Sequence, residues 1–233
     1  MTNYILETKI IKPLSENKPK HIIVLCHGYG GDGQDISMLA INWQRFLPDA
    51  IFFCPNGPEV CSVNPSGFQW FNLSTEQDDK ILENSITAEE KLISYLDQIL
   101  NNYNLDSHNL ALVGFSQGGA VALYAGVRSS QCLAGVLALS TYWVGAQDSN
   151  LMPGRAPEGL SIEIHHGTLD PVVPYVLGER ARDALSALGY PVTFQAFTMP
   201  HSVGPEQLQA IGQWVALRLK PDSSSRSKEF MVL

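Results

Sequence analysis

The chain has 233 residues, of which 45% are hydrophobic and 16% are charged, and it carries a formal net charge of −8 at pH 7. This composition is typical of a soluble globular protein with enough apolar residues for a buried core, and it excludes disorder over most of the chain. An acidic surface repels nucleic acids and anionic lipids, so we expect neither as a partner, and polyanionic substrates are disfavoured.

The N-terminal stretch MTNYILETKI lacks a basic segment followed by an apolar one, and no apolar run approaches the roughly 20 residues needed to span a bilayer. The four cysteines form no CxxC pair and lie mostly inside apolar runs, which indicates buried free thiols. They are Cys26, Cys54, Cys61 and Cys132. We therefore expect a cytoplasmic protein without stable membrane insertion.

Short apolar runs alternate with segments of helical periodicity, which predicts an α/β fold with a mostly parallel central sheet and helices on both faces. The first predicted strands lie at 3–11, 22–27 and 50–54. A long helix is predicted from Asp79 to Leu100, because apolar residues there recur on one helical face. Those residues are Leu82, Ile86, Ile93, Leu96 and Leu100.

The second half of the chain keeps the same rhythm. Strands are predicted at 109–115, 133–139, 160–165 and 192–198, and helices at 117–128 and 174–188. Pro205 opens a last helix whose predicted core face is Leu208, Ile211 and Val215. Residues 220–229 are polar and aperiodic. We expect one domain over 1–219 and a flexible tail over 220–233.

The segment Gly114-Phe115-Ser116-Gln117-Gly118-Gly119 contains GxSxG, in which small residues permit the tight turn that presents a nucleophilic serine. The string alone is a weak signal, but a strand-like run (LALVGF) precedes the serine and a helix-like run (GGAVALYAG) follows it. A nucleophile elbow requires this order. The alternative is a glycine turn with an N-capping serine.

A serine needs a histidine to take its proton, and the histidine needs a carboxylate to hold its tautomer. In the order serine, acid, base, Asp170 and His201 each follow a predicted strand directly. His166 is the alternative base and Asp148 the alternative acid. His165 and His166 are strand neighbours that face opposite sides and cannot hold one ion, so we expect neither metal nor cofactor.

Two backbone amides should stabilise the oxyanion, and we predict those of Gln117 and Tyr29. Tyr29 lies in a glycine-rich loop over 26–33, where His27 is expected to brace the loop. A phosphate loop is the alternative for the same glycines, but the GK[ST] ending that it requires is missing.

An apolar substrate slot is predicted around the serine. The segment 55–75 is rich in proline and glycine and carries several large apolar residues, and two later segments add to it. The predicted substrate-binding residues are Phe68, Trp70, Phe71, Leu73, Tyr142, Val172 and Val173. Apolar residues at such a mouth also leave a homodimer contact open.

Several motifs occur together and in order: HGYGGDG at 27–33, FCPNGPE at 53–59, QWFNL at 69–73, GFSQGG at 114–119, HGTLDPVVP at 166–174 and PHSV at 200–203. In these the chain resembles the phospholipase/carboxylesterase family of α/β-hydrolases, over residues 20–218. The resemblance implies the α/β-hydrolase fold, the triad Ser116, Asp170 and His201, and oxyanion amides from Tyr29 and Gln117.

Tyr29 and the QWFNL segment depart from the HGLGD and AWFD-like segments of eukaryotic acyl-protein thioesterases, and look more like bacterial carboxylesterases. We therefore predict a serine carboxylesterase acting on small-molecule or acyl-chain esters through an acyl-serine intermediate. The alternatives are an acyl-protein thioesterase or lysophospholipase acting on longer chains, and a binding protein that keeps the fold without catalysis.

Overall fold

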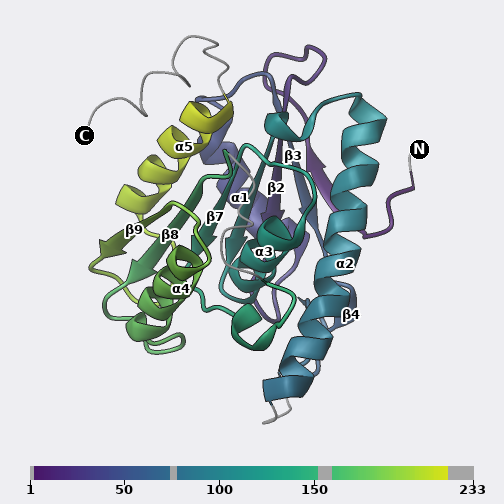
Figure 1. Ribbon diagram of the computed structural model, residues 1–233. Coiled ribbons are helices and arrows are strands. Elements are labelled where there is room, and N and C mark those ends of the chain that lie inside the picture. The colour runs from purple at the N-terminus through teal and green to yellow at the C-terminus, as the bar shows by residue number, and fades with distance from the viewer. Residues whose placement is uncertain (1–2, 74–77, 152–158, 220–233) are drawn as a thin grey trace.

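The computed structural model describes residues 3–73, 78–151 and 159–219. A seven-stranded sheet has the order β1-β3-β2-β6-β7-β8-β9, and only β1 runs antiparallel to its neighbour (Figure 1). Its strands are β1 (Thr8–Ile11), β2 (His21–Cys26), β3 (Ala50–Pro55), β6 (Leu110–Phe115), β7 (Gly135–Leu139), β8 (Ile162–Gly167) and β9 (Val192–Phe197). A small hairpin joins β4 (Glu59–Val60) to β5 (Phe68–Gln69).

Helices cover both faces of the sheet, as predicted. They are α1 (Gly33–Trp43), α2 (Asp78–Tyr103), α3 (Gln117–Arg128), α4 (Tyr175–Ala187) and α5 (Pro205–Leu219), with single 3₁₀ turns at Ser107–Asn109 and Gly145–Gln147. One buried cluster packs the sheet against α2, α3 and α4, and a second packs it against α1 and α5 (Figure 1). The mostly parallel α/β fold is therefore confirmed.

The central strands are continuous apolar runs because both of their sides are buried. In β2, Ile22 and Val24 belong to the cluster beneath α2 and α3, whereas Ile23 and Leu25 belong to the cluster beneath α1 and α5. The carboxyl ends of β2, β6, β7, β8 and β9 share one edge of the sheet, since these strands are parallel. Loops from distant parts of the sequence therefore meet at that edge.

Helix α1 was not predicted from the sequence. It begins after Asp32, whose side chain accepts a hydrogen bond from the Asp35 amide at 2.7 Å, and it buries Ile36, Ala40 and Trp43 at helical spacing. The strand predicted at 3–11 is shorter, since only Thr8–Ile11 pairs with β3. The predicted tail over 220–233 lies outside the described residues.

The buried face of helix α2 agrees with the predicted one only in part. Leu96 and Leu100 are buried, as predicted, whereas Ile86 and Ile93 are only half-buried. The buried face also includes Glu89, which pairs with Arg128 of α3. In the described part of the chain, no helix is long and apolar enough to cross a membrane.

Candidate active site

Ser116 lies in the sharp turn between β6 and α3. Its backbone has a φ of 55° and a ψ of −120°, a conformation that is strained for a residue with a side chain. The turn is held on both sides, because the Ser116 amide donates to the carbonyl of Leu139 and the Ser116 carbonyl accepts from Thr141 Oγ1, each at 2.8 Å. These contacts fix the serine at the carboxyl edge of the sheet.

The glycines of the elbow are required by close packing. A Cβ on Gly114 would lie 2.1 Å from the carbonyl oxygen of Gly118, and a Cβ on Gly118 would lie 2.3 Å from that of Cys26. Neither backbone oxygen can move away without breaking the turn. The GxSxG segment therefore has the close-packed backbone that a nucleophile elbow requires, and the Ser116 side chain makes no N-cap hydrogen bond of the kind the alternative expects.

Asp170 and His201 come together from the loops that follow β8 and β9. His201 Nδ1 lies 2.7 Å from Asp170 Oδ2, and Asp170 Oδ1 accepts the amides of Val172 at 2.9 Å and Val173 at 2.8 Å. Burial would raise the pKa of Asp170, but the hydrogen bond from His201 and those from the two amides outweigh it and lower that pKa. The ionised carboxylate therefore keeps a proton on Nδ1 of His201.

With its proton on Nδ1, His201 presents an unprotonated Nε2 that can act as a base. The His201 ring packs against Phe115, the residue before the serine, with ring centroids 4.7 Å apart. The base thus lies beside the elbow. The structure therefore brings the predicted acid and base into contact and places the predicted base beside the residue that precedes the predicted nucleophile.

The alternative base, His166, is fully buried behind the acid. Its Nε2 lies 2.9 Å from the carbonyl of Val173 and 3.7 Å from Asp170 Oδ2. Its ring packs on Gly178 of α4. His165 lies on the other side of the strand and is equally buried. Its Nε2 lies 2.6 Å from Glu163 Oε1, within hydrogen-bond distance. Both histidines are therefore buried in the interior, and the Nε2 atom of each is already engaged by another group.

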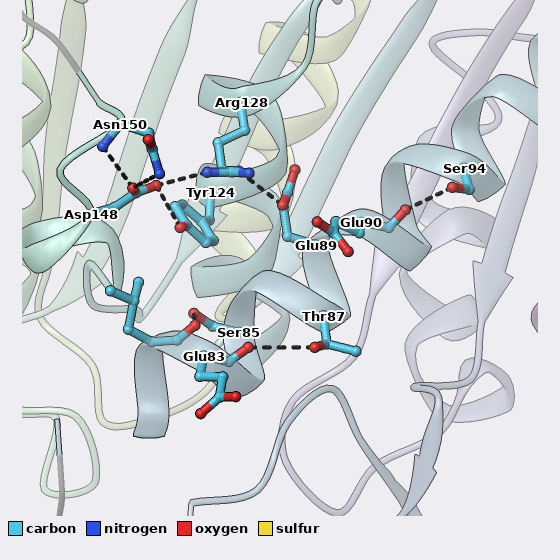
Figure 2. A network of polar contacts seen from close by, with 11 residues as sticks. Glu83, Ser85, Thr87, Glu89, Glu90, Ser94, Tyr124, Arg128, Asp148 and Asn150 are labelled. Atoms are coloured by element: carbon cyan, nitrogen blue, oxygen red, sulfur yellow. Dashed lines mark hydrogen bonds and ion pairs between the residues drawn. The ribbon is translucent and has the colours of Figure 1, made fainter. Parts of the chain in front are cut away.

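The alternative acid, Asp148, is bound to a different set of residues. Its Oδ2 accepts from Tyr124 at 2.7 Å and from Arg128 at 2.8 Å, and its Oδ1 accepts from Asn150 (Figure 2). Asp148 is not a solvated loop carboxylate, because only 7% of the residue is exposed. A cavity of about 250 Å³ adjoins this network, and none of Ser116, Asp170 and His201 lines it.

His27 braces the loop over 26–33, as the sequence predicted. We call this segment the oxyanion loop, because it holds Tyr29, one of the two residues whose amides are predicted to bind the oxyanion. The amide of Gly57 donates to His27 Nε2 at 2.8 Å, so Nδ1 carries the proton and donates to the carbonyl of Gly28 at 2.7 Å. Burial lowers the pKa of His27, which keeps the ring neutral. With both ring nitrogens engaged, His27 cannot act as a second catalytic base.

The two amides predicted for the oxyanion hole are free of backbone partners. Among the described residues, neither the Tyr29 nor the Gln117 amide donates to a carbonyl outside the regular elements, and Gln117 opens α3, where first-turn amides lack a helical acceptor. The adjoining Gly30 and Gly31 are anchored to Phe68 through two backbone hydrogen bonds, at 2.9 and 2.8 Å. The loop is thus held rigidly beside the elbow.

The Gln117 side chain has a role that sequence reasoning missed. Its Oε1 accepts the Trp70 amide at 2.9 Å, and its Nε2 donates to the carbonyl of Phe71 at 2.6 Å. The Trp70 indole in turn donates to the carbonyl of His27 at 2.9 Å. We call the two hydrogen bonds of the Gln117 side chain the Gln117 clamp. The clamp joins the 68–73 segment to the elbow, and the Trp70 indole joins the same segment to the oxyanion loop.

The predicted substrate-binding residues lie in different surroundings. Trp70 and Phe71 are 1% exposed and belong to the core, and Tyr142 packs against the same core cluster. Val173 is buried beside the acid, whereas Leu73 and Val172 are exposed and Phe68 is half-buried. The adjoining segments 74–77 and 152–158 lie outside the described residues, so the predicted slot stays a prediction.

A cavity of about 370 Å³ opens beside the triad, on the side of α1. We call it the α1 cavity. The residues that line it include Tyr29, Ile36, Leu39, Phe115, His201 and Val203. Gly28 also lines it, and a Cβ on Gly28 would lie 3.3 Å from Ser116 Cβ, so Ser116 lies directly behind a lining residue. None of the predicted substrate-binding residues lines this cavity, because α1 itself was not predicted.

Fold and site together define a hydrolase of the α/β-hydrolase class. Residues 8–219 match the phospholipase/carboxylesterase family, and the chain belongs to that family. It is 30% identical over 233 residues to "Acyl-protein thioesterase 1" of Mycosarcoma maydis, covering 91% of this chain and 96% of that protein. Its counterpart in Gibberella zeae is 29% identical over 214 residues, covering 85% and 91%.

Solved structures agree with this assignment. The crystal structure of esterase PE8 superposes with a TM-score of 0.82 at 30% identity, covering 92% of this chain and 99% of that one. Arabidopsis thaliana SOBER1 gives a TM-score of 0.73 at 25% identity, covering 86% and 99%. The chain is thus an esterase or thioesterase hydrolase by family.

Proposed function

We propose that this protein is a serine carboxylesterase with Ser116 as nucleophile, His201 as general base and Asp170 as the acid that orients it. The observation that carries the proposal is the 2.7 Å contact between Asp170 and His201 beside the positive-φ serine. The carboxylate holds the imidazole in the tautomer that accepts the serine proton, and the elbow presents the hydroxyl to substrate.

The reaction has two halves. In the first, Ser116 Oγ bonds to the ester carbonyl carbon as His201 Nε2 takes the hydroxyl proton, and the tetrahedral intermediate then expels the alcohol, which leaves with that proton. In the second, water attacks the acyl-serine, His201 takes a proton from it, and Ser116 regains its proton as the carboxylic acid departs. An ester and one water thus give an alcohol and an acid.

The amides of Tyr29 and Gln117 are proposed to bind the oxyanion in both halves. Their freedom from backbone partners supports this role. Each such donor contributes about 3 kcal/mol to transition-state stabilisation. The clamp on the Gln117 side chain and the anchoring of Gly30 to Phe68 hold the two donors in place before substrate arrives.

A second candidate function, acyl-protein thioesterase or lysophospholipase, is favoured by the curated relatives, which bear the first of these names. Thioesters react through the same acyl-serine chemistry, so the difference lies in the acyl chain. A channel that buries a long chain gains about 0.8 kcal/mol per methylene. Hydrolysis of p-nitrophenyl esters from acetate to palmitate separates the two: activity falling beyond short chains supports the carboxylesterase, and a steady rise supports the alternative.

Replacing the nucleophile tests the proposal itself. Ser116→Ala should lower ester hydrolysis by about three orders of magnitude or more and abolish labelling by a fluorophosphonate probe, because no other group can form the acyl intermediate. The matched control is Ser94→Ala on the exposed side of α2, which should keep full activity and labelling. Circular dichroism checks that both variants fold. Retention of more than a few per cent of activity in Ser116→Ala would exclude Ser116 as the nucleophile.

A further inference from the structure

The α1 cavity contains one unpaired charge. Ile36, Leu39, Phe115 and Val203 make most of its wall apolar, whereas Asp35 contributes a carboxylate at its rim. No lysine or arginine lines the cavity, and within the described residues none forms an ion pair with Asp35. The Asp35 charge is therefore free to act on a bound molecule.

His27, which lines the α1 cavity, supplies no compensating positive charge. Its ring is neutral because its Nε2 accepts the Gly57 amide. Burial lowers the pKa of His27, and the carboxylates of Asp32 and Asp35 act in the opposite direction through their negative charge. Asp35 is thus close enough to His27 for its charge to act on that ring.

The position of the base identifies which part of a substrate occupies this space. On the proposed function, His201 returns the serine proton to the departing oxygen or sulfur, so that atom must lie within hydrogen-bond reach of Nε2. His201, Ser202 and Val203 form one wall of the cavity. A group attached to the departing atom therefore extends along this wall toward α1.

We propose that the α1 cavity receives the leaving group of the ester or thioester, and that Asp35 gives the enzyme a preference for leaving groups that carry a positive charge. The apolar wall suits a short aliphatic or alkylammonium group, and the carboxylate at the rim attracts its cation while repelling an anionic one. This inference rests on the proposed hydrolase function and adds the chemical class of its substrate.

Asp35 also lies in the first turn of α1, where a carboxylate stabilises the helix. That structural role would change the stability of the enzyme and its activity on every substrate alike. Discrimination between two substrates of the same shape and different charge is not affected by it. The test is therefore a ratio of two specificity constants, measured on the same enzyme preparation.

The experiment compares S-acetylthiocholine with its uncharged analogue, in which a tert-butyl group replaces the trimethylammonium group. Both carry the same acetyl group, and the released thiol is measured directly. The ratio of kcat/KM, cationic over neutral, should fall about threefold in Asp35→Asn and further in Asp35→Lys. In the unmodified enzyme the ratio should also fall as salt is raised to about 1 M.

Glu90→Gln is the matched control, because Glu90 is an exposed carboxylate on α2, across the sheet from α1. It should leave the ratio as it is. Hydrolysis of both esters with a ratio that Asp35→Asn does not change overturns the inference and leaves the proposed function intact. A native protein that hydrolyses neither ester overturns both.

Discussion

At the scale of single residues, the site depends on the position of one proton. The Asp170 carboxylate is held by two backbone amides and by His201, so it stays ionised and keeps the proton on Nδ1 of the imidazole. Asp148 has a pKa that burial would raise, but hydrogen bonds from Asn150, Tyr124 and Arg128 lower it. Both carboxylates are thus charged, and only one of them touches the base.

We predict that Asp170→Asn lowers kcat by about four orders of magnitude with little change in KM, because the asparagine amide favours the wrong histidine tautomer. Asp148→Asn should keep kcat within a few-fold of the parent. It should instead lower the free energy of unfolding by about 1–3 kcal/mol, since it weakens a buried hydrogen-bonded pair. Steady-state kinetics and urea unfolding measure these effects. The reverse pattern in kcat would place the acid in the 141–151 loop.

The sequence predicts that Asp170 and His201 lie together, because each follows a strand directly, and their 2.7 Å contact agrees with that prediction. It could not predict the partners of Asp148, since Tyr124 and Arg128 lie on a helix whose orientation depends on packing. The same limit explains the core positions of Trp70 and Phe71. Large apolar residues in a loop are as consistent with packing as with a substrate slot.

At the scale of elements, the Gln117 clamp and the Trp70 indole together join the elbow, the 68–73 segment and the oxyanion loop. The 68–73 segment is not part of the main sheet and packs on the elbow through two hydrogen bonds from one side chain. The same side chain belongs to the residue whose backbone amide is proposed to bind the oxyanion. A substitution that removes the clamp therefore changes only where the Gln117 backbone amide lies, since the amide itself remains.

Gln117→Leu removes the clamp and keeps the backbone amide. We expect kcat to fall about tenfold and the free energy of unfolding to fall by about 1–3 kcal/mol, because two buried backbone groups lose their partners. KM should change less than kcat. The measurements are steady-state kinetics and denaturant unfolding.

Gln98→Leu is the control for that variant. Gln98 also bonds two backbone groups, the Ile5 amide at 3.0 Å and the Asn3 carbonyl at 2.9 Å, but on the side of α2 that faces the N-terminal segment. The Gln98→Leu variant should be less stable than the parent and fully active. Equal loss of activity in both variants would show that Gln117 affects catalysis only through general stability.

Most elements could be predicted because their apolar periods are clear, but α1 was missed and the buried face of α2 was predicted only in part. The signal for α1 was present, since Asp32 precedes Ile36, Ala40 and Trp43 at helical spacing. Glycines before it favoured a loop instead. On α2, hydropathy alone excluded Glu89 from the buried face, and only the arginine of α3 makes its burial acceptable.

At the scale of the whole molecule, Arg128 joins α2 to the loop after β7. Figure 2 shows its guanidinium between Glu89 and Asp148, at 3.0 and 2.8 Å. Two carboxylates share one cation. Burial raises the pKa of Glu89 to about 7, against the opposing effect of Arg128, and Glu90 and Asp148 add to the rise.

A raised pKa in the folded state means that the folded protein binds a proton more tightly than the unfolded chain between about pH 4.5 and 7. Glu89 therefore contributes less to stability as pH rises through this window. We predict that the stability of Glu89→Gln, relative to the parent, increases by about 2 kcal/mol between pH 5 and 8. Thermal unfolding across this range tests the sign, and a difference that stays flat or decreases would contradict it.

The placement of the triad along the sheet has a consequence for biosynthesis. Ser116 and the oxyanion loop follow the central strands β6 and β2. Asp170 and His201 follow β8 and β9, the last two strands in the order of the sheet. Ser116 is synthesised before His201, and a single domain folds as a unit. A nascent chain that still lacks β9 and the loop after it thus holds the serine without its proposed base. On the proposed mechanism, ester hydrolysis therefore begins only after His201 has been made and has joined the fold.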